Sequence, residues 1–345
     1  MKKTLSNLLA NTETKIIGRH KLLRNLNKSE KGIYEDFKNS LFAELQGGGV
    51  RISYRGDNRT FLKKTMFKGT DKYSDFRFYS RIFNIGGKTK NCYTGGRNFT
   101  IGNIEDVSLS VFENVFKDLC DIFNNYINCP DIGPRVRIFK KNNPNIFNYF
   151  LNASNLSNFK TLLLPLLPAD MLLIRDYYIY LIHVFGVTQL YSDTPLISTS
   201  YSLDVAKYFG TNEHRHDDCL VYIYLITDPI DEVGIDEKYL DEFKRFKQFS
   251  NFPLIHKTVF SQEREISVFG ALFTHCIFGV YDMKKGKIVL NSHLFMNGNE
   301  TRPDSCSQKG FYIPEHYFHR DFKDSKYLKG VCKIGRNFKD LKRTT

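Results

Sequence analysis

The hydrophobic pattern of the chain changes near residue 196, and this change limits the folds that it can adopt. Before it, apolar residues recur at the spacing of helices, in stretches 3–10, 29–46, 106–127, 144–168 and 170–185. After it, short apolar runs predict strands at 196–200, 220–227, 258–260, 266–273, 277–283 and 287–290, the last two joined by a hairpin turn. One earlier strand is predicted at 50–55. We therefore expect an α/β (α+β) protein.

The chain carries 50 Lys and Arg residues against 37 Asp and Glu residues, a formal net charge of +13. A surplus of this size indicates an anionic partner but does not bear on the fold. In residues 51–97, twelve Lys or Arg residues are interleaved with Phe and Tyr rings against three acids. Such a stretch could bind phosphates and stack on nucleobases, or its rings could belong to the core of a twisted sheet. A second basic stretch covers 320–343.

Cysteine and histidine usage argues against disulfides and metals. The seven cysteines are an odd number without a C-x-x-C pair, which fits neither a disulfide framework nor a zinc ribbon. The densest group of ligand types, 214–219 (His-Arg-His-Asp-Asp-Cys), lies on one loop, and we expect a polar turn there and no metal.

No stretch approaches the roughly 20 apolar residues of a membrane-spanning helix. The first residues are too polar for a secretory signal. We expect a cytoplasmic protein without membrane contact, acting in its own cell or delivered into a target cell.

Two short segments place polar residues where a buried strand would be apolar. In residues 53–57 (Ser-Tyr-Arg-Gly-Asp), Arg55 ends a strand and Gly56 would let a backbone approach a ligand. In residues 196–202 (Leu-Ile-Ser-Thr-Ser-Tyr-Ser), three consecutive hydroxyl residues follow an apolar strand start and precede a capped helix. Each pattern is common by chance when it stands alone.

A third segment carries two carboxylates at the entrance to a strand. Glu263 and Glu265 are separated by one residue, and side chains at i and i+2 of a strand point to the same side. Both could therefore face one pocket. The alternative is a charged strand edge, which resists aggregation.

In this order, the three segments resemble the R-S-E class of mono-ADP-ribosyltransferases, built on an aromatic-Arg-Gly strand, a Ser-Thr-Ser strand and a Glu-x-Glu turn. The matching residues are Tyr54-Arg55-Gly56, Ser198-Thr199-Ser200 and Glu263-Arg264-Glu265. Residues 195–210 are similar to the strand and helix of bacterial binary-toxin enzymatic components. A fainter resemblance to prokaryotic FRG-domain proteins rests on 183–188 (His-Val-Phe-Gly-Val-Thr). The matches cover 48–62 and 172–275, less than half of the chain.

The resemblance implies a fold and a division of the chain. The expected fold is a split two-sheet ADP-ribosyltransferase core with N-terminal helices. The long gap between Arg55 and Ser198 departs from the compact toxin pattern and implies a helical insertion at about 104–170. The expected parts are an N-terminal helical segment at 1–47, the core at 48–290 with its insertion, and a C-terminal basic extension at 291–345.

The resemblance also implies catalytic roles. Cleavage of the bond between ribose and nicotinamide passes through an oxocarbenium-like state, which a carboxylate near the anomeric carbon stabilises. Glu265 matches the catalytic glutamate, and Ser198 matches the hydroxyl that orients it. Glu263 matches the residue that orients or deprotonates the acceptor, which is an arginine in protein-modifying relatives.

Contacts to NAD+ are implied in the same way. Arg55 would hold the pyrophosphate, and the backbone of Gly56 would meet the nicotinamide carboxamide. Phe209 matches a ring that packs on nicotinamide, with a core phenylalanine as the equal alternative. His183 could assist binding or be a buried core histidine. The remaining implied NAD+-binding residues come from the motif matches: Tyr54, Thr199 and Ser200.

The implied activity is transfer of ADP-ribose from NAD+ to a macromolecular acceptor, either protein arginine or nucleic acid, without a metal. The expected setting is a prokaryotic toxin, effector or phage-defence system, where an antitoxin or immunity protein can be a partner. Two alternatives are an NAD+ glycohydrolase, which uses water as the acceptor, and a nucleic-acid-binding module on a degenerate transferase fold.

Overall fold

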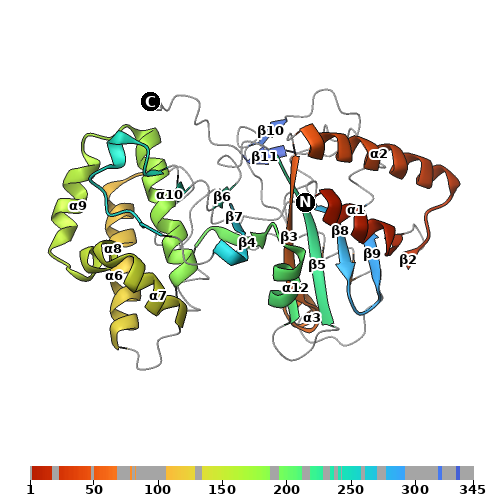
Figure 1. The fold of residues 1–345 in the computed structure, drawn as a ribbon, viewed down its shortest axis with the longest axis horizontal. Coiled ribbons are helices and arrows are strands. Elements are labelled where there is room, and N and C mark those ends of the chain that lie inside the picture. The colour runs from red at the N-terminus through yellow and green to blue at the C-terminus, as the bar shows by residue number, and fades with distance from the viewer. Residues whose placement is uncertain are drawn as a thin grey trace. The chain divides into compact units, whose positions relative to one another are not determined.

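The computed structural model describes residues 2–17, 23–47, 50–67, 78–79, 82, 106–128, 134–186, 194–211, 218–227, 234–236, 240–241, 243–257, 261–269, 277–291, 318–320 and 332–334. The chain divides into two compact units, whose elements are labelled in Figure 1. Unit 1 consists of Met1–Gly87, Ile197–Gly234 and Glu263–Arg336. Unit 2 consists of Lys88–Leu196, Ile235–Gln262 and Asn337–Thr345.

A mixed sheet forms the centre of unit 1, in the strand order β2-β1-β9-β8-β5-β3-β4-β7-β6. Strand β1 runs parallel to β9, whereas β3, β5, β8 and β9 are antiparallel to one another in turn. The strands are β1 (Glu13–Ile17), β2 (Leu23–Arg24), β3 (Val50–Asn58), β4 (Leu196–Ser200), β5 (Cys219–Thr227), β6 (Gly234–Asp236), β7 (Glu265–Phe269), β8 (Ile277–Asp282) and β9 (Lys287–Leu290). A separate antiparallel pair consists of β10 (Phe318–Arg320) and β11 (Cys332–Ile334).

The structure confirms the mixed α/β class, with all strands from β1 to β9 in one mixed sheet. The N-terminal helices are confirmed as α1 (Lys2–Ala10) and α2 (Lys28–Gly47), but β1 lies between them and pairs with β9. Because of this pairing, residues 1–47 are part of the sheet-containing unit and not a separate segment.

Strand β5 is the core of the sheet. It pairs with β3 along its whole length, from Val50 opposite Thr227 to Asn58 opposite Cys219, and residues 219–226 are all buried. This explains its uninterrupted apolar sequence, since a strand buried on both faces needs no polar alternation. Helix α2 covers the neighbouring β8 through Phe37, whose ring stacks on Phe278 with 6.0 Å between centroids.

Helix α12 (Leu203–Thr211) packs directly on β3 at Gly56. A Cβ atom at Gly56 would overlap the carbonyl oxygen of Ala206 and stand 2.8 Å from the amide nitrogen of Gly210. A Cβ at Gly210 would in turn stand 3.1 Å from the Cα of Gly56. The two glycines therefore let the helix that follows Ser-Thr-Ser touch the strand that carries Arg55.

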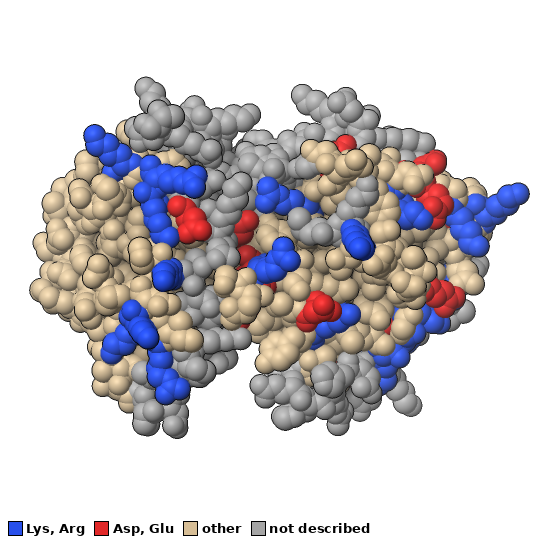
Figure 2. All heavy atoms as spheres, in the orientation of Figure 1, with Lys and Arg blue, Asp and Glu red and all other residues tan. Residues whose placement is uncertain are grey.

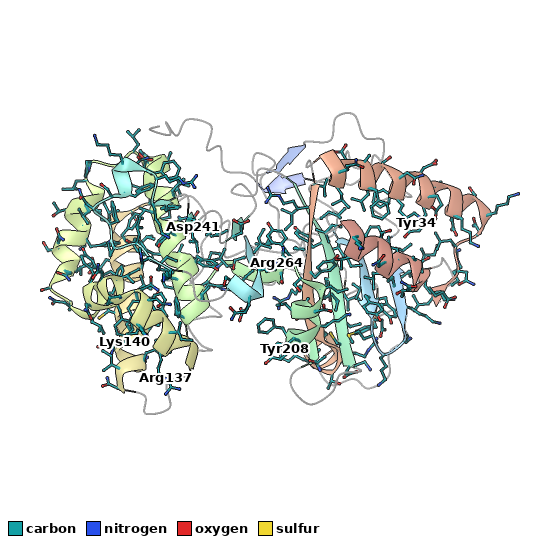
Figure 3. All side chains as sticks on the ribbon, in the orientation of Figure 1. Tyr34, Arg137, Lys140, Tyr208, Asp241 and Arg264 are labelled. Atoms are coloured by element: carbon teal, nitrogen blue, oxygen red, sulfur yellow. The ribbon has the colours of Figure 1, made fainter. Side chains whose placement is uncertain are left out.

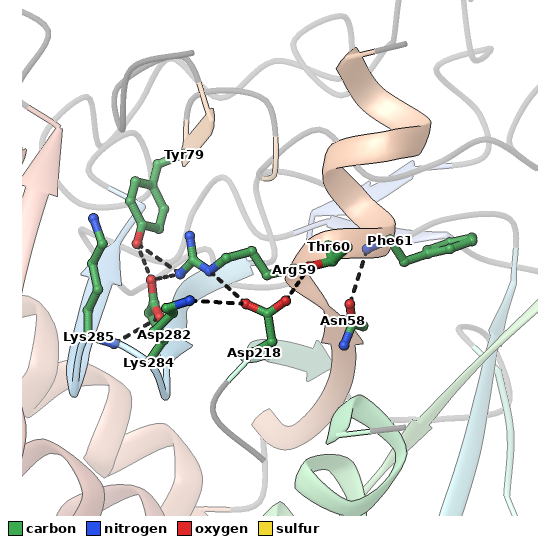
Figure 4. Close-up of polar contacts among 9 residues, drawn as sticks. All are labelled: Asn58, Arg59, Thr60, Phe61, Tyr79, Asp218, Asp282, Lys284 and Lys285. Atoms are coloured by element: carbon green, nitrogen blue, oxygen red, sulfur yellow. Dashed lines mark hydrogen bonds and ion pairs between the residues drawn. The ribbon is translucent and has the colours of Figure 1, made fainter. Parts of the chain in front are cut away.

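A buried polar network attaches helix α3 (Arg59–Phe67) to β8 (Figure 4). The guanidinium of Arg59 pairs with the carboxylate of Asp282, which also accepts a hydrogen bond from the Tyr79 hydroxyl. Thr60 donates to Asp218 at the start of β5. Arg59, Tyr79 and Asp282 are all buried. The positive charge of Arg59 and the negative charge of Asp282 therefore require each other as partners.

This network bears on the basic aromatic stretch 51–97. Its described part forms nearly all of strand β3, followed by helix α3. Phe78 and Tyr79 are buried, and the guanidinium of Arg59 lies over the Phe78 ring, 5.0 Å from its centroid. These two rings therefore serve packing. Most of the remaining stretch lies outside the described residues.

Unit 2 is helical, with α6 (Leu109–Asn128), α7 (Pro134–Asn142), α8 (Pro144–Leu151), α9 (Asn155–Leu163) and α10 (Pro168–Phe185). The helical pattern predicted at 144–168 is confirmed, and it forms two short helices, α8 and α9. The core of the unit is aromatic: Phe123 stacks on Phe147 at 4.8 Å, and Phe150 contacts Tyr178 at 5.3 Å between centroids. The expected insertion at 104–170 falls entirely within this unit, which is longer and also includes Ile235–Gln262.

The hairpin between β8 and β9 is confirmed, and Gly286 in its turn has φ +59°. Several predictions lie outside the described residues: the strand 258–260, the end of the strand 266–273, residues 214–217 and nearly all of the C-terminal extension. Within the described ranges, no helix is long and apolar enough to cross a membrane.

Candidate active site

Three adjacent strands of unit 1 bring the three sequence motifs together. Strands β3, β4 and β7 carry Arg55, Ser198 and Glu265, and they are neighbours in the sheet. Tyr54 lies opposite Ser200 in the β3–β4 register. Nη1 of Arg55 donates a hydrogen bond to the backbone oxygen of Ser198 over 2.9 Å. Residues far apart in the sequence thus converge on one place.

The carboxylate of Glu265 is held by two serine hydroxyls. Oγ of Ser267, two residues along β7, donates to Oε1 over 2.8 Å, and the hydroxyl of Ser198 donates from β4. Burial raises the pKa of Glu265 above its ordinary value of 4.5, and the negative charge of Glu263 acts in the same direction. The two serine hydrogen bonds and the positive charge of Arg55 oppose this rise.

The guanidinium of Arg55 is fixed by Asp57, two residues along the same strand. Nε lies 3.2 Å from Oδ2 and Nη2 lies 3.2 Å from Oδ1, which is a two-bonded fork. Both side chains are partly exposed, 28% for Arg55 and 14% for Asp57. Tyr222 lies opposite Arg55 on β5 and is fully buried, and its hydroxyl has no hydrogen-bond partner among the described residues. The site therefore combines a positioned cation with an unsatisfied buried hydroxyl.

The turn before β7 is strained and locked. A 3-10 turn covers Ser261–Glu263, and Arg264 follows with φ 47°, in the left-handed region that residues other than glycine rarely adopt. The carbonyl of Glu263 accepts a hydrogen bond from Oγ of Ser200 at 2.6 Å, and the carbonyl of Arg264 accepts one from the Tyr201 amide at 3.0 Å. These two bonds hold the glutamates at the end of the Ser-Thr-Ser strand.

Thr199 and Ser200 connect strands in the structure. Oγ1 of Thr199 donates to the carbonyl of Ile266 on β7 over 2.9 Å, and both hydroxyl residues are buried. Ser200 also accepts a bond from the Ser202 amide at the start of α12. Of the three hydroxyl residues, Ser198 is therefore the one that reaches the Glu265 carboxylate.

The two aromatic candidates differ in exposure. Phe209 on α12 is 52% exposed and forms a ring pair with Tyr208, which is 60% exposed, at 5.5 Å between centroids. The alternative interpretation of Phe209 as a core residue is therefore wrong. Tyr54 is fully buried, so its ring belongs to the sheet core and not to an open surface.

His183 belongs to unit 2. It lies on α10, is buried, and its Nδ1 is 2.7 Å from Oγ1 of Thr194. A buried imidazole with a hydroxyl partner corresponds to the core-histidine interpretation.

Sequence reasoning assigned no role to three contributors: Asp57, Ser267 and Arg264. Asp57 and Ser267 each stand two residues from a motif residue on the same strand, so the alternation rule could have identified both as neighbours on one face. The left-handed backbone at Arg264 has no sequence signal, because arginine is not typical of that conformation.

No group of three or more His, Cys, Asp or Glu side chains that could hold a metal ion occurs among the described residues. Comparisons with protein families, curated proteins and solved structures found no match for the chain.

Proposed function

We propose that the chain is an NAD+-dependent mono-ADP-ribosyltransferase of the R-S-E class. The observation that carries this proposal is the convergence of Arg55, Ser198 and Glu265 on adjacent strands. A dinucleotide pyrophosphate requires a guanidinium such as that of Arg55, and a developing oxocarbenium ion requires a partly buried carboxylate such as that of Glu265.

Glu265 is the proposed catalytic residue. The bond between C1′ of the ribose and the pyridinium nitrogen breaks, the electron pair stays on nitrogen, and neutral nicotinamide leaves. The carboxylate stabilises the positive charge that develops on the ribose. This electrostatic attraction is stronger inside a protein than in water. Ser198 and Ser267 keep this carboxylate in one orientation.

Arg55 is proposed to bind the pyrophosphate of NAD+. In the structure its fork is directed to Asp57 and its Nη1 to the Ser198 carbonyl, so both groups set its orientation before a ligand arrives. The proposed role of Gly56, backbone contact with the carboxamide, stands beside a packing role that the structure gives it under α12.

Glu263 is proposed to act on the acceptor. It is half-buried, and its backbone is fixed by Ser200. The acceptor nucleophile forms the new bond to C1′, and its proton passes to the Glu263 carboxylate.

The finer fold is also a proposal. The β3–β4 register consists of the single pair Tyr54 and Ser200, whereas β3 pairs with β5 over nine residues. A sheet joined so narrowly supports a split core, with β4 and β7 as the start of a second sheet. A toxin, effector or phage-defence setting with an inhibitory partner fits this class of enzyme.

Incubation with NAD+ labelled in the adenylate moiety tests the proposal, with protein, DNA and RNA from a cell lysate as acceptors. Release of nicotinamide together with label on a macromolecule is the expected result. Nicotinamide release without label transfer would indicate a glycohydrolase. Neither release nor transfer, with nucleic-acid binding retained, would indicate a binding module on a degenerate fold.

A further inference from the structure

We infer that the acceptor is an unpaired base in a single-stranded nucleic acid, approached through Arg264 and the exposed rings of unit 1. This inference rests on the proposed function, because it identifies the acceptor of the same site. The nucleophile is an N–H nitrogen of the base: it forms the bond to C1′, nicotinamide leaves with the electron pair, and the proton passes to Glu263.

Arg264 lies at the entrance to β7, directly after the turn Ser261–Glu263. It stands between the two glutamates in the sequence, directly after the residue proposed to meet the acceptor, and its side chain is exposed. The turn holds this residue in a strained backbone conformation, with φ 47°, and its carbonyl is tied to Tyr201. The residue held in this strained conformation therefore carries an exposed guanidinium.

The positive charge of Arg264 affects which acceptors can approach the turn. A guanidinium beside Glu263 repels a second guanidinium, so an arginine acceptor is disfavoured at this turn. An anionic acceptor is favoured for the same reason. Phosphate groups provide such anions at every nucleotide.

Exposed aromatic side chains favour a nucleic acid over an acidic protein as the acceptor. The exposed large aromatic side chains of the described residues all lie in unit 1: Phe61 at 61%, Tyr208 at 60% and Phe209 at 52%. Phe61 lies on α3, which directly follows β3, and the other two lie on α12, which packs on β3 at Gly56. Tyr208 projects from α12 away from β3 and β5 (Figure 3).

Exposed rings on both helices next to the Arg55 strand suit stacking on bases, which need to be unpaired to be reached. Every nucleotide offers a flat base for stacking, whereas an acidic protein surface consists mainly of Asp and Glu side chains. The general charge does not make this choice, because Lys and Arg side chains are spread over both units on the face seen in Figure 2. The specific feature is an exposed cation at the turn before β7 together with exposed rings on α3 and α12 of the same unit.

Fluorescence anisotropy with a labelled mixed-sequence single-stranded DNA 12-mer, and with the RNA of the same sequence, tests this inference. Arg264→Gln and Tyr208→Ala should each weaken binding about tenfold. Arg264→Lys should restore most of the affinity, because it restores the charge. Arg264→Gln should also lower the slope of affinity against salt by about 0.7, the value for one phosphate contact on a single strand, whereas Tyr208→Ala should not.

The matched control is Arg245→Gln, which removes an exposed arginine from unit 2 and should leave binding unchanged. Equal affinity of wild type and Arg264→Gln, no binding by wild type, or equally tight binding of poly-glutamate would overturn the inference. So would labelled ADP-ribose that is transferred only to protein.

Nicotinamide release is measured in the same samples, with and without the oligonucleotide. Oligonucleotide binding that depends on Arg264 and Tyr208, without nicotinamide release, would support the binding surface and contradict the proposed function. Failure of the nucleic-acid inference and failure of the proposed transferase function therefore give different results in these samples.

Discussion

Arg55 on β3 and Ser198 on β4 are joined by a hydrogen bond of 2.9 Å between Nη1 and the Ser198 carbonyl, across 143 positions of sequence. The bond connects the aromatic-Arg-Gly strand to the Ser-Thr-Ser strand, and Ser198 in turn reaches the Glu265 carboxylate. The three motifs thus form one continuous set of contacts.

Gly56 is expected to tolerate no side chain. Gly56→Ala should lower the free energy of unfolding by about 3 kcal/mol, because the new methyl group overlaps the Ala206 carbonyl on a helix backbone that cannot move aside. Gly32→Ala is the control: it lies on the exposed side of α2 with nothing within 4 Å, and should raise stability by about 0.5–1 kcal/mol. Urea unfolding of both variants measures the difference. Equal stability would mean that α12 does not rest on Gly56.

Arg264 and Gly286 both have a left-handed backbone conformation. Substitution should change the free energy of unfolding in opposite directions at the two positions. Arg264→Gly should raise the free energy of unfolding by about 0.5–1 kcal/mol, because glycine adopts φ 47° without strain. Gly286→Ala should lower it by about 1 kcal/mol, although nothing crowds that position. Thermal unfolding of the two variants gives the comparison. A loss of stability in Arg264→Gly would show that the arginine side chain stabilises the turn by more than its strain costs.

The raised pKa of Glu265 predicts a pH-dependent stability. A carboxyl group that binds its proton more tightly in the folded state stabilises that state below its ordinary pKa of 4.5, and the contribution is lost as pH rises through the folded value. Glu265→Gln removes this titration, so the variant should gain stability relative to wild type as pH rises, by about 1.4 kcal/mol for each pH unit that separates the folded from the unfolded pKa of Glu265.

Ser267→Ala provides the control for that prediction. It removes a hydrogen bond that lowers the pKa of Glu265. In this variant the decline in stability should therefore extend to higher pH than in the wild type. Denaturant midpoints between pH 4 and 9 measure both effects. A stability difference between Glu265→Gln and wild type that does not change with pH would contradict the burial of this carboxylate.

Glu263→Ala should separate transfer from cleavage. The proposed role of this carboxylate is to receive the acceptor proton, so label transfer should fall by about 100-fold or more while part of the nicotinamide release remains. The backbone contact with Ser200 is independent of the side chain, so the turn should keep its shape. Nicotinamide release and label transfer are followed in one reaction. A parallel loss of both would assign Glu263 to NAD+ cleavage and not to the acceptor.

Sequence periodicity predicted the main elements because their patterns are local. Helix α6 and strand β5 have long, regular apolar runs, and both are observed. Strand β1 was missed because five residues, Glu13–Ile17, form a strand only by pairing with β9, which is distant in the chain. No local pattern encodes such a contact.

The candidate site was predictable in its motifs but not in its internal contacts. The convergence of Arg55, Ser198 and Glu265 follows from strand order, which resemblance suggested and local sequence does not determine. The second role of Gly56, as the surface on which α12 rests, depends on a helix that begins 147 positions later, at Leu203, and is visible only in three dimensions. The exposure of Phe209 likewise depends on which face of α12 meets the sheet.

The most direct test of the central claim is the rate of nicotinamide release from NAD+ by Glu265→Gln. The matched control is Glu35→Gln, which makes the same change at an exposed position on α2. Glu265→Gln should release nicotinamide at least about 100-fold more slowly, with a cooperative unfolding transition retained, and Glu35→Gln should equal wild type. Wild-type rates in a folded Glu265→Gln protein would contradict the assignment of this carboxylate as the catalytic group.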